Sequence, residues 1–159
     1  MSFFIKAASK IDLPELDELM FQLHDEHHQQ CPDLFKTAED IEQEKSIARY
    51  LESPEALVFV AKQDSTGEII GFVSGHFCEL VSTVSKAIPM GSIDELYVVP
   101  SYRQTGVAES LLNKIEQTLT DYGVQQLFVE VWAFNQSAQS LYQKRGFQHH
   151  IHWLRKSVV

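Results

Sequence analysis

This sequence is poor in cysteine and has no long apolar run. Cys31 and Cys78 are its only cysteines, and they provide neither a disulfide framework nor the spacing of a metal site. No apolar stretch approaches the length that spans a bilayer, and residues 1–6 lack the charge pattern and cleavage site of a signal peptide. We therefore expect a cytoplasmic protein with reduced thiols, no resident metal and no membrane partner.

Basic residues are also scarce, with 13 Lys and Arg against 22 Asp and Glu and a net charge of −9. Nucleic-acid binding depends on Lys and Arg contacts with phosphates, so this balance argues against a nucleic-acid partner. An acidic surface is compatible with a cationic small molecule drawn into an acidic cleft, and equally with plain solubility. The length of 159 residues fits a single domain, 1–159, with a sizeable core.

Hydrophobic periodicity predicts an α/β protein with a mixed sheet and helices packed against it. The predicted strands cover residues 3–7, 56–61, 69–77, 92–99 and 126–132. The predicted helices run from Asp12 to a break at 31–33, from 37 to about 51, from 106 to about 122 and from 136 to 144. Residues 80–90 are expected to form a loop, and the tail 147–159 one more strand or a hairpin.

Two well-known phosphate-binding loops are missing. The chain has no Gly-Lys-Ser/Thr for a nucleoside triphosphate and no G-x-G-x-x-G for a dinucleotide. It has instead Arg103-x-x-Gly106-x-Ala108, between an apolar run and an amphipathic helix. Such a turn points successive amides outward at a helix N-terminus, where the helix dipole favours an anion. An ordinary strand–turn–helix, with Gly106 relieving crowding, is the alternative.

Two signatures in the right order resemble the Gcn5-related N-acetyltransferase (GNAT) family. The first is the loop at 103–108, which matches the pyrophosphate pattern R/Q-x-x-G-x-G/A. The second is the segment 135–147, which matches N-x-x-A-x-x-L-Y-x-x-x-G-F. The resemblance covers residues 56–148 well and the N-terminal third loosely. Many members have Gly directly after the loop arginine, whereas this chain has Gln104.

The resemblance implies a GNAT-like fold in which two neighbouring parallel strands, here 92–99 and 126–132, splay apart around the pantetheine of acetyl-CoA. It assigns cofactor contacts to both splayed strands, the loop and the last helix. These residues are Leu96, Val98, Arg103, Gln104, Thr105, Gly106, Val107, Ala108, Asn135 and Ala138.

The reaction requires a base for the acceptor amine, because an alkyl amine with a pKa of about 10.4 is mostly protonated at neutral pH. Asp94 and Glu95 are the candidates, with a slight preference for Glu95. Neighbouring strand residues face opposite sides, so we expect only one of them to face the substrate. A solvent-facing or salt-bridged acid is the alternative reading of both. The resemblance also assigns the oxyanion to the Leu96 amide and protonation of the leaving thiolate to Tyr142, which could otherwise be a core aromatic.

The expected function is acetyl transfer from acetyl-CoA to a primary amine of a small, cationic acceptor. Acetylation of a protein or peptide amine, or a non-catalytic acetyl-CoA-binding module, is the alternative. The segment 23–35 lies where the family's substrate-side segment falls. Its His24, His27 and His28 share one helix face, which a metal-dependent protein could use but a solvated helix explains better. Dimers are common in the family, so a homodimer is left open.

Overall fold

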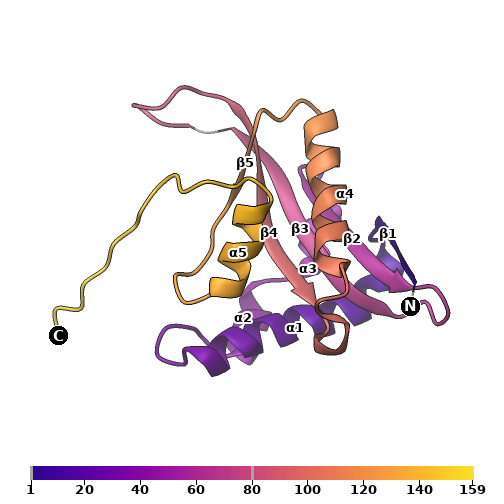
Figure 1. Ribbon diagram of the computed structural model, residues 1–159. Helices are drawn as coiled ribbons and strands as arrows, with labels where there is room; N and C mark the ends of the chain where they lie inside the picture. The colour runs from indigo at the N-terminus through magenta and orange to yellow at the C-terminus, as the bar shows by residue number, and fades with distance from the viewer. Residues whose placement is uncertain (1, 80) are drawn as a thin grey trace.

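The computed structural model describes residues 2–79 and 81–159, and it contains one five-stranded mixed sheet. The strands are β1 (Phe3–Ala7), β2 (Ala56–Gln63), β3 (Ile69–Glu79), β4 (Pro89–Val98) and β5 (Gln126–Val129). They are arranged in the order β1-β2-β3-β4-β5 (Figure 1). The first four are antiparallel neighbours, whereas β4 and β5 are parallel. The predicted mixed α/β architecture is therefore confirmed.

The described residues contain five α-helices. They are α1 (Leu13–Gln30), α2 (Ala38–Glu44), α3 (Ile47–Glu52), α4 (Val107–Asp121) and α5 (Gln136–Lys144). Four of them cover the two faces of this sheet, and α2 packs on α1 (Figure 1). The apolar sides of α1 and α3 pack on one face, and those of α4 and α5 pack on the other. Within the described residues, no helix is long and apolar enough to cross a membrane.

Helix α4 packs on glycines of β3 and β4, which leave no room for a side chain beneath it. A Cβ added at Gly75 would come within 2.8 Å of the Ile115 side chain, and one at Gly91 within 2.9 Å of Leu119. Ile115 and Leu119 both belong to the apolar stripe of α4, and both are fully buried. This close packing fixes the helix against β3 and β4, and it thereby fixes the position of the helix N-terminus at the end of β4.

The structure corrects three predicted boundaries. The helix expected over 37–51 is two helices, because residues 45 and 46 are extended and the Ser46 side chain caps α3 by accepting from the Ala48 amide. The strand expected over 126–132 ends at Val129, and the strand expected from 92 begins at Pro89, inside the predicted loop 80–90. Residue 80 of that loop lies outside the described residues.

The tail was expected to form a strand or a hairpin, and this prediction is wrong. Residues 147–159 form neither. Phe147 packs on Tyr142 and His150 on Phe128, and the chain beyond them leads away from the body of the molecule (Figure 1). Ile151 is 80% exposed and Trp153 is 95% exposed. A strand needs a neighbouring edge to bond its backbone amides, and in this chain the tail does not run along one.

Candidate functional site

A gap opens in the sheet where β4 and β5 separate. The two strands pair only from Met90–Gln126 to Ile93–Val129, although β4 continues to Val98. At the far end of β4, the amide of Val99 donates to Ile70 in β3. Amide directions alternate along a strand, so the amides at 96 and 98 point to the other edge, toward the gap. The amides of Leu96 and Val98 therefore lie along the edge of β4 that β5 leaves unpaired.

The loop after β4 ends in a set of free amides at the start of α4. The first helical bond runs from the Ser110 amide to the Gly106 carbonyl at 3.1 Å. Within the described chain, the amides of residues 104–108 form no hydrogen bond, whereas the Arg103 amide donates to Pro100 at 3.3 Å. The first amides of a helix have no intrahelical partner and carry its positive dipole end. An anion at this point would meet Gln104, Thr105, Gly106, Val107 and Ala108, but not a free Arg103 amide.

Two loop residues adopt the left-handed conformation, Gln104 with φ of 63° and Gly106 with φ of 90°. Nothing lies within 4 Å of the Cβ position at Gly106. A glycine there keeps the space beside the amides open and avoids the strain that a side chain would meet. Gln104 adopts this conformation despite the backbone strain that a side chain causes there. It occupies the position at which many GNAT sequences have glycine.

The Arg103 side chain turns away from these amides and ties the loop to α1. Its Nε donates to the Val98 carbonyl at 2.8 Å, and its Nη2 donates to Glu26 at 2.9 Å. The guanidinium lies 5.3 Å from the centre of the Tyr97 ring. The Val98 carbonyl is therefore already bonded, and only its amide is left for a ligand in the gap.

Asp94 and Glu95 face the same side of the sheet, which corrects the expected alternation. Ser74 pairs with Glu95 and Gly75 pairs with Ile93, so Asp94 is an extra residue in β4. Such a β-bulge interrupts the alternation of side chains. Asp94 and Glu95 then contact Ser74 and His76, which are two residues apart and share one face of β3.

Glu95 is a buried carboxylate, 5% exposed, and both of its oxygen atoms contact hydrogen-bond donors. Its Oε1 accepts from the Tyr50 hydroxyl at 2.7 Å and lies 2.7 Å from Lys45 Nζ. Its Oε2 accepts from the Ser74 hydroxyl. Burial, followed by the charge of Glu95, raises the pKa of the Tyr50 phenol, so this phenol stays a donor to the carboxylate.

Asp94 is more open and lines a cleft of about 720 Å³. Its Oδ2 lies 2.6 Å from His76 Nδ1, and its Oδ1 accepts from the Ser92 hydroxyl at 2.8 Å. The cleft lies between α3 and the β4–β5 gap. It is lined by Lys45, Arg49, Tyr50, Ser53, Glu55, Ala56, Gly75, His76, Ser92, Ile93, Asp94 and Glu130.

Tyr142 and Asn135 belong to α5, which follows β5. Burial and the nearby charge of Glu116 raise the pKa of Tyr142 to about 12, so its phenol is neutral and able to donate a proton. The Tyr142 side chain is 7% exposed and packs on Phe147, so it also forms part of the hydrophobic core. The Asn135 side-chain oxygen Oδ1 caps α5 by accepting from the Ala138 backbone amide at 3.1 Å, which leaves the side-chain NH2 group of Asn135 for a ligand.

The three histidines of α1 do not form one site. His28 Nδ1 lies 2.9 Å from the Phe35 carbonyl oxygen. His27 stacks on the Phe35 ring, which contacts Trp132 after β5. The described residues contain no group of three or more His, Cys, Asp or Glu side chains arranged to hold a metal ion.

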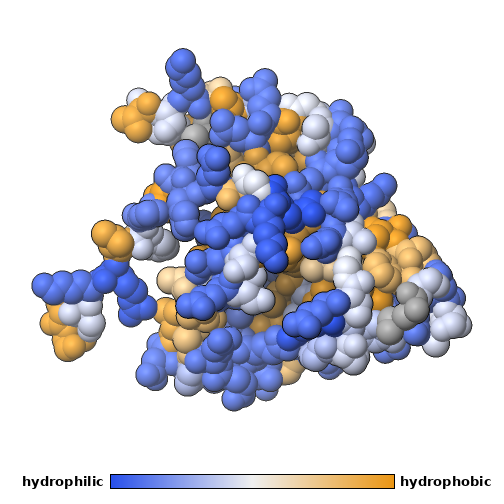
Figure 2. Space-filling model, in the orientation of Figure 1, coloured by the Kyte–Doolittle hydropathy of each residue, from blue (hydrophilic) through white to orange (hydrophobic). Residues whose placement is uncertain are grey.

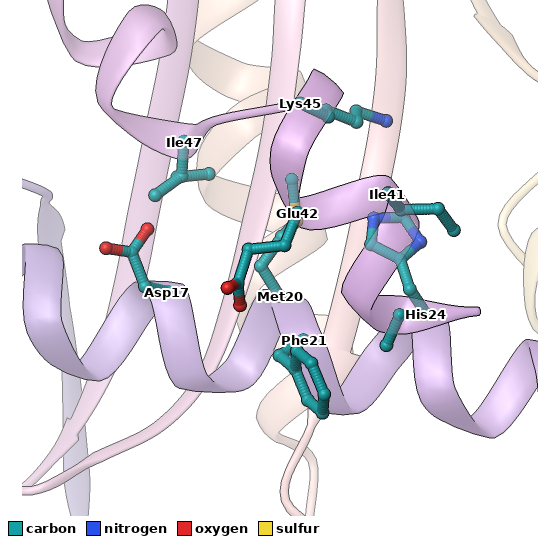
Figure 3. A pocket seen from close by; sticks show the side chains of 9 residues that line it. Asp17, Met20, Phe21, His24, Ile41, Glu42, Lys45 and Ile47 are labelled. Carbon is teal, nitrogen blue, oxygen red and sulfur yellow. The ribbon is translucent and has the colours of Figure 1, made fainter. Parts of the chain in front are cut away.

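His24 instead lines a small pocket between α1 and α2 (Figure 3). Its Nε2 is buried and has no hydrogen-bond partner among the described residues. The pocket volume of about 20 Å³ has room for one water molecule. Burial, followed by the charge of Lys45, lowers the pKa of His24 to about 4, so the ring is neutral at physiological pH.

The sequence did not predict five side chains that contact the two carboxylates, which are Lys45, Tyr50, Ser74, His76 and Ser92. One feature of the sequence could have indicated Ser74 and His76. They are polar residues, two positions apart, in a mostly apolar strand, β3. No feature of the sequence indicated Lys45 and Tyr50, because their contacts with Glu95 join distant parts of the chain.

Comparisons with known proteins find similar sequences and similar folds. The sequence model of the acetyltransferase (GNAT) family matches residues 20–147. An uncharacterized N-acetyltransferase of Mycobacterium tuberculosis is 31% identical over 102 residues, which are 64% of this chain and 59% of that protein. The match thus spans less than two thirds of that curated relative.

Two solved structures are also similar. An acetyltransferase from Vibrio fischeri shares 57% identity with a TM-score of 0.68, over 81% of this chain and 96% of that one. An aminoglycoside N-acetyltransferase in complex with coenzyme A has a TM-score of 0.72 at 21% identity, over 98% of this chain and 95% of that one. The second likeness concerns the fold alone.

Proposed function

This chain belongs to the acetyltransferase (GNAT) family, and we propose that it transfers the acetyl group of acetyl-CoA directly to a primary amine of a small, cationic acceptor. The observation that carries the proposal is the row of unbonded amides at residues 104–108, beside a gap between two parallel strands. This combination suits a ligand with an anionic end and an extended, amide-containing arm.

The donor fits both parts of this arrangement. The diphosphate of coenzyme A carries negative charge, which the positive end of α4 and its free amides favour. The open space at Gly106 lets the diphosphate approach the backbone. The pantetheine arm contains amide groups, and the amides of Leu96 and Val98 offer it donors along the unpaired edge of β4.

The acid–base groups are Glu95 and Tyr142. Glu95 would accept the proton of the acceptor amine, since it is a carboxylate on the cleft side of the strand that borders the gap. The Leu96 amide, next along the strand, would donate to the oxygen on which negative charge develops. Tyr142, with its raised pKa of about 12, would donate a proton to the leaving thiolate.

The cleft supports a cationic acceptor. Its charged lining consists of three carboxylates, on Glu55, Asp94 and Glu130, and the two basic side chains of Lys45 and Arg49. Lys45 is paired with Glu95 and Asp94 with His76, which leaves the two carboxylates of Glu55 and Glu130 against the one guanidinium of Arg49 in the described lining. The net charge of −9 adds a longer-range attraction for cations.

We also propose that the chain acts in the cytoplasm as a single-domain homodimer. Both cysteines are free thiols, which suits a reducing compartment. β5 is the last strand of the sheet, and residues 151–159 of the tail carry exposed apolar side chains away from the body (Figure 2). The tail contains Arg155 and Lys156 and no acidic residue, so it complements the acidic body of a second copy, on whose β5 edge it would pair.

Two measurements on the wild-type protein test the acetyl-transfer proposal. Calorimetry with coenzyme A reports donor binding, and release of free thiol from acetyl-CoA reports turnover with spermidine, kanamycin, amino acids and basic peptides. We expect binding, together with thiol release that is fastest with a small polycation. Fastest release with the peptides would favour a protein acceptor, binding without release a non-catalytic module, and absence of binding would overturn the proposal.

A further inference from the structure

Lys45 is the chain's own primary amine at the candidate base. It ends α2 in an extended conformation, with φ of −129° and ψ of 124°, and its side chain reaches across to β4. The distance from Lys45 Nζ to Glu95 Oε1 is 2.7 Å. Among the described residues that line the cleft, Lys45 is the only lysine.

The exposure of the two partners is very unequal. The Lys45 side chain is 41% exposed, whereas the Glu95 side chain is 4% exposed. The carboxylate is thus held by the fold, through Tyr50 and Ser74 as well, while the ammonium comes from the solvent side of the cleft. A flexible four-carbon stem places it there, and an incoming acceptor amine would approach from the same side.

A base must lie within hydrogen-bond reach of the group from which it takes a proton, about 2.6–3.2 Å away. Lys45 Nζ satisfies this requirement at Glu95 without any movement. We propose that Lys45 occupies the position of the acceptor amine and that the enzyme acetylates Lys45 on Nζ when no acceptor is present. This inference rests on the acetyl-transfer function proposed above.

The step balances with the groups already named. The Lys45 ammonium gives one proton to Glu95, and the neutral nitrogen attacks the carbonyl carbon of acetyl-CoA. A carbon–nitrogen bond forms, the carbon–sulfur bond breaks, and the thiolate takes a proton from Tyr142. The nitrogen then loses its second proton, which returns the Tyr142 phenolate to a phenol through solvent, and Glu95 releases the first proton to solvent. The products are acetyl-lysine and free coenzyme A, with no oxidant or reductant. Because the nucleophile is tethered, its effective concentration at the base is far above that of a dissolved amine.

The modification would also alter the cleft. Acetyl-lysine is neutral, so the pair with Glu95 is lost and the carboxylate is left with Tyr50 and Ser74 as partners. Each chain has a single such amine, and self-acetylation therefore stops after one acetyl group at this site. A bound acceptor displaces Lys45 from Glu95 and so protects it.

The test is mass spectrometry of the full-length protein incubated with acetyl-CoA alone, followed by peptide mapping. Lys36 provides a matched control, since it is also ion-paired, at 3.1 Å from Glu44, but is exposed outside the cleft. We expect one acetyl group, at Lys45, formed at least tenfold faster than at Lys36. K45R should abolish the addition, K36R should not, E95Q should slow it, and the best acceptor from the amine panel should suppress it.

Two results would overturn the inference. Acetylation of Lys45 at the rate of Lys36 would identify ordinary chemical acetylation of surface amines. An enzyme that releases thiol with the amine panel yet leaves Lys45 unmodified would show that the Lys45–Glu95 pair is only structural, and the proposed function would survive. If neither coenzyme A binding nor thiol release is found, the function and the inference fall together.

Discussion

Asp94 and Glu95 are adjacent in the sequence, yet their side chains contact the same face of β3, through His76 and Ser74. The bulge at Asp94 gives the two carboxylates different surroundings on one side of the sheet. Glu95 is buried among donors, and Asp94 lies in the open cleft. This difference separates a candidate base from a candidate acceptor-binding carboxylate, and the two roles predict different kinetics.

Replacing Glu95 by glutamine should remove the base while keeping the size of the side chain. An amide cannot take up the amine proton, so we expect kcat to fall about 10²- to 10⁴-fold. D94N is the matched variant, and we expect it mainly to raise KM for a cationic acceptor. Thiol-release kinetics measure both, with circular dichroism to verify folding. A wild-type kcat for E95Q would return Glu95 to a structural role.

The Y142F variant tests the proton donor. The raised pKa of about 12 keeps the Tyr142 phenol protonated at neutral pH, so it can donate a proton to the leaving thiolate. We therefore expect a lower rate of thiol release in a single turnover and an unchanged Kd for coenzyme A. A single-turnover rate equal to that of the wild type would leave Tyr142 with packing against Phe147 as its only role.

The sequence predicted the parts of this site that depend on local spacing. The apolar stripe of α4 repeats at helical spacing, and the pattern from Arg103 to Ala108 puts the free amides at its N-terminus. The match to the family covers residues 20–147 and so includes this segment. These features need no knowledge of which strands are neighbours, and they could therefore be read from one stretch of sequence.

The parts that were missed depend on pairing between distant segments. The bulge at Asp94 exists only in register with β3, so strand alternation alone gave the wrong face. The Lys45–Glu95 pair requires the break between α2 and α3, where the sequence predicted one continuous helix. The tail 147–159 has the composition of a strand, but the structure gives it no neighbouring edge.

A bulky side chain at Gly106 tests whether the loop 103–108 binds the diphosphate of coenzyme A. G106W should abolish coenzyme A binding, because its side chain would occupy the open space beside the amides and meet an unfavourable φ. Calorimetry measures this, and unchanged affinity would contradict the assignment. Q104G provides the control in the same loop. It retains the amide and should retain affinity, while the free energy of unfolding rises by up to about 1 kcal/mol as left-handed strain is relieved.

His24 should make stability depend on pH. Its pKa is about 4 in the folded protein against an ordinary value of 6.5, so between these values the unfolded chain binds the extra proton. The free energy of unfolding therefore falls as pH decreases from about 6.5 to about 4. Urea denaturation at several pH values should show a shallower slope for H24Q than for the wild type. H149Q, in the exposed tail, should keep the wild-type slope, and equal slopes for all three would contradict the assignment.

Removing residues 148–159 should convert the proposed dimer into a monomer. Ile151 and Trp153 are exposed in the single chain, and the edge of β5 offers a second copy a partner for the tail backbone. Light scattering coupled to size-exclusion chromatography measures the mass of both forms. Because the tail is basic and the body holds every acidic residue of the chain, salt should weaken the contact without abolishing its apolar part. The double variant R155E/K156E should weaken the dimer without shortening the chain, and a full-length protein that is monomeric in low salt would refute the exchange of tails.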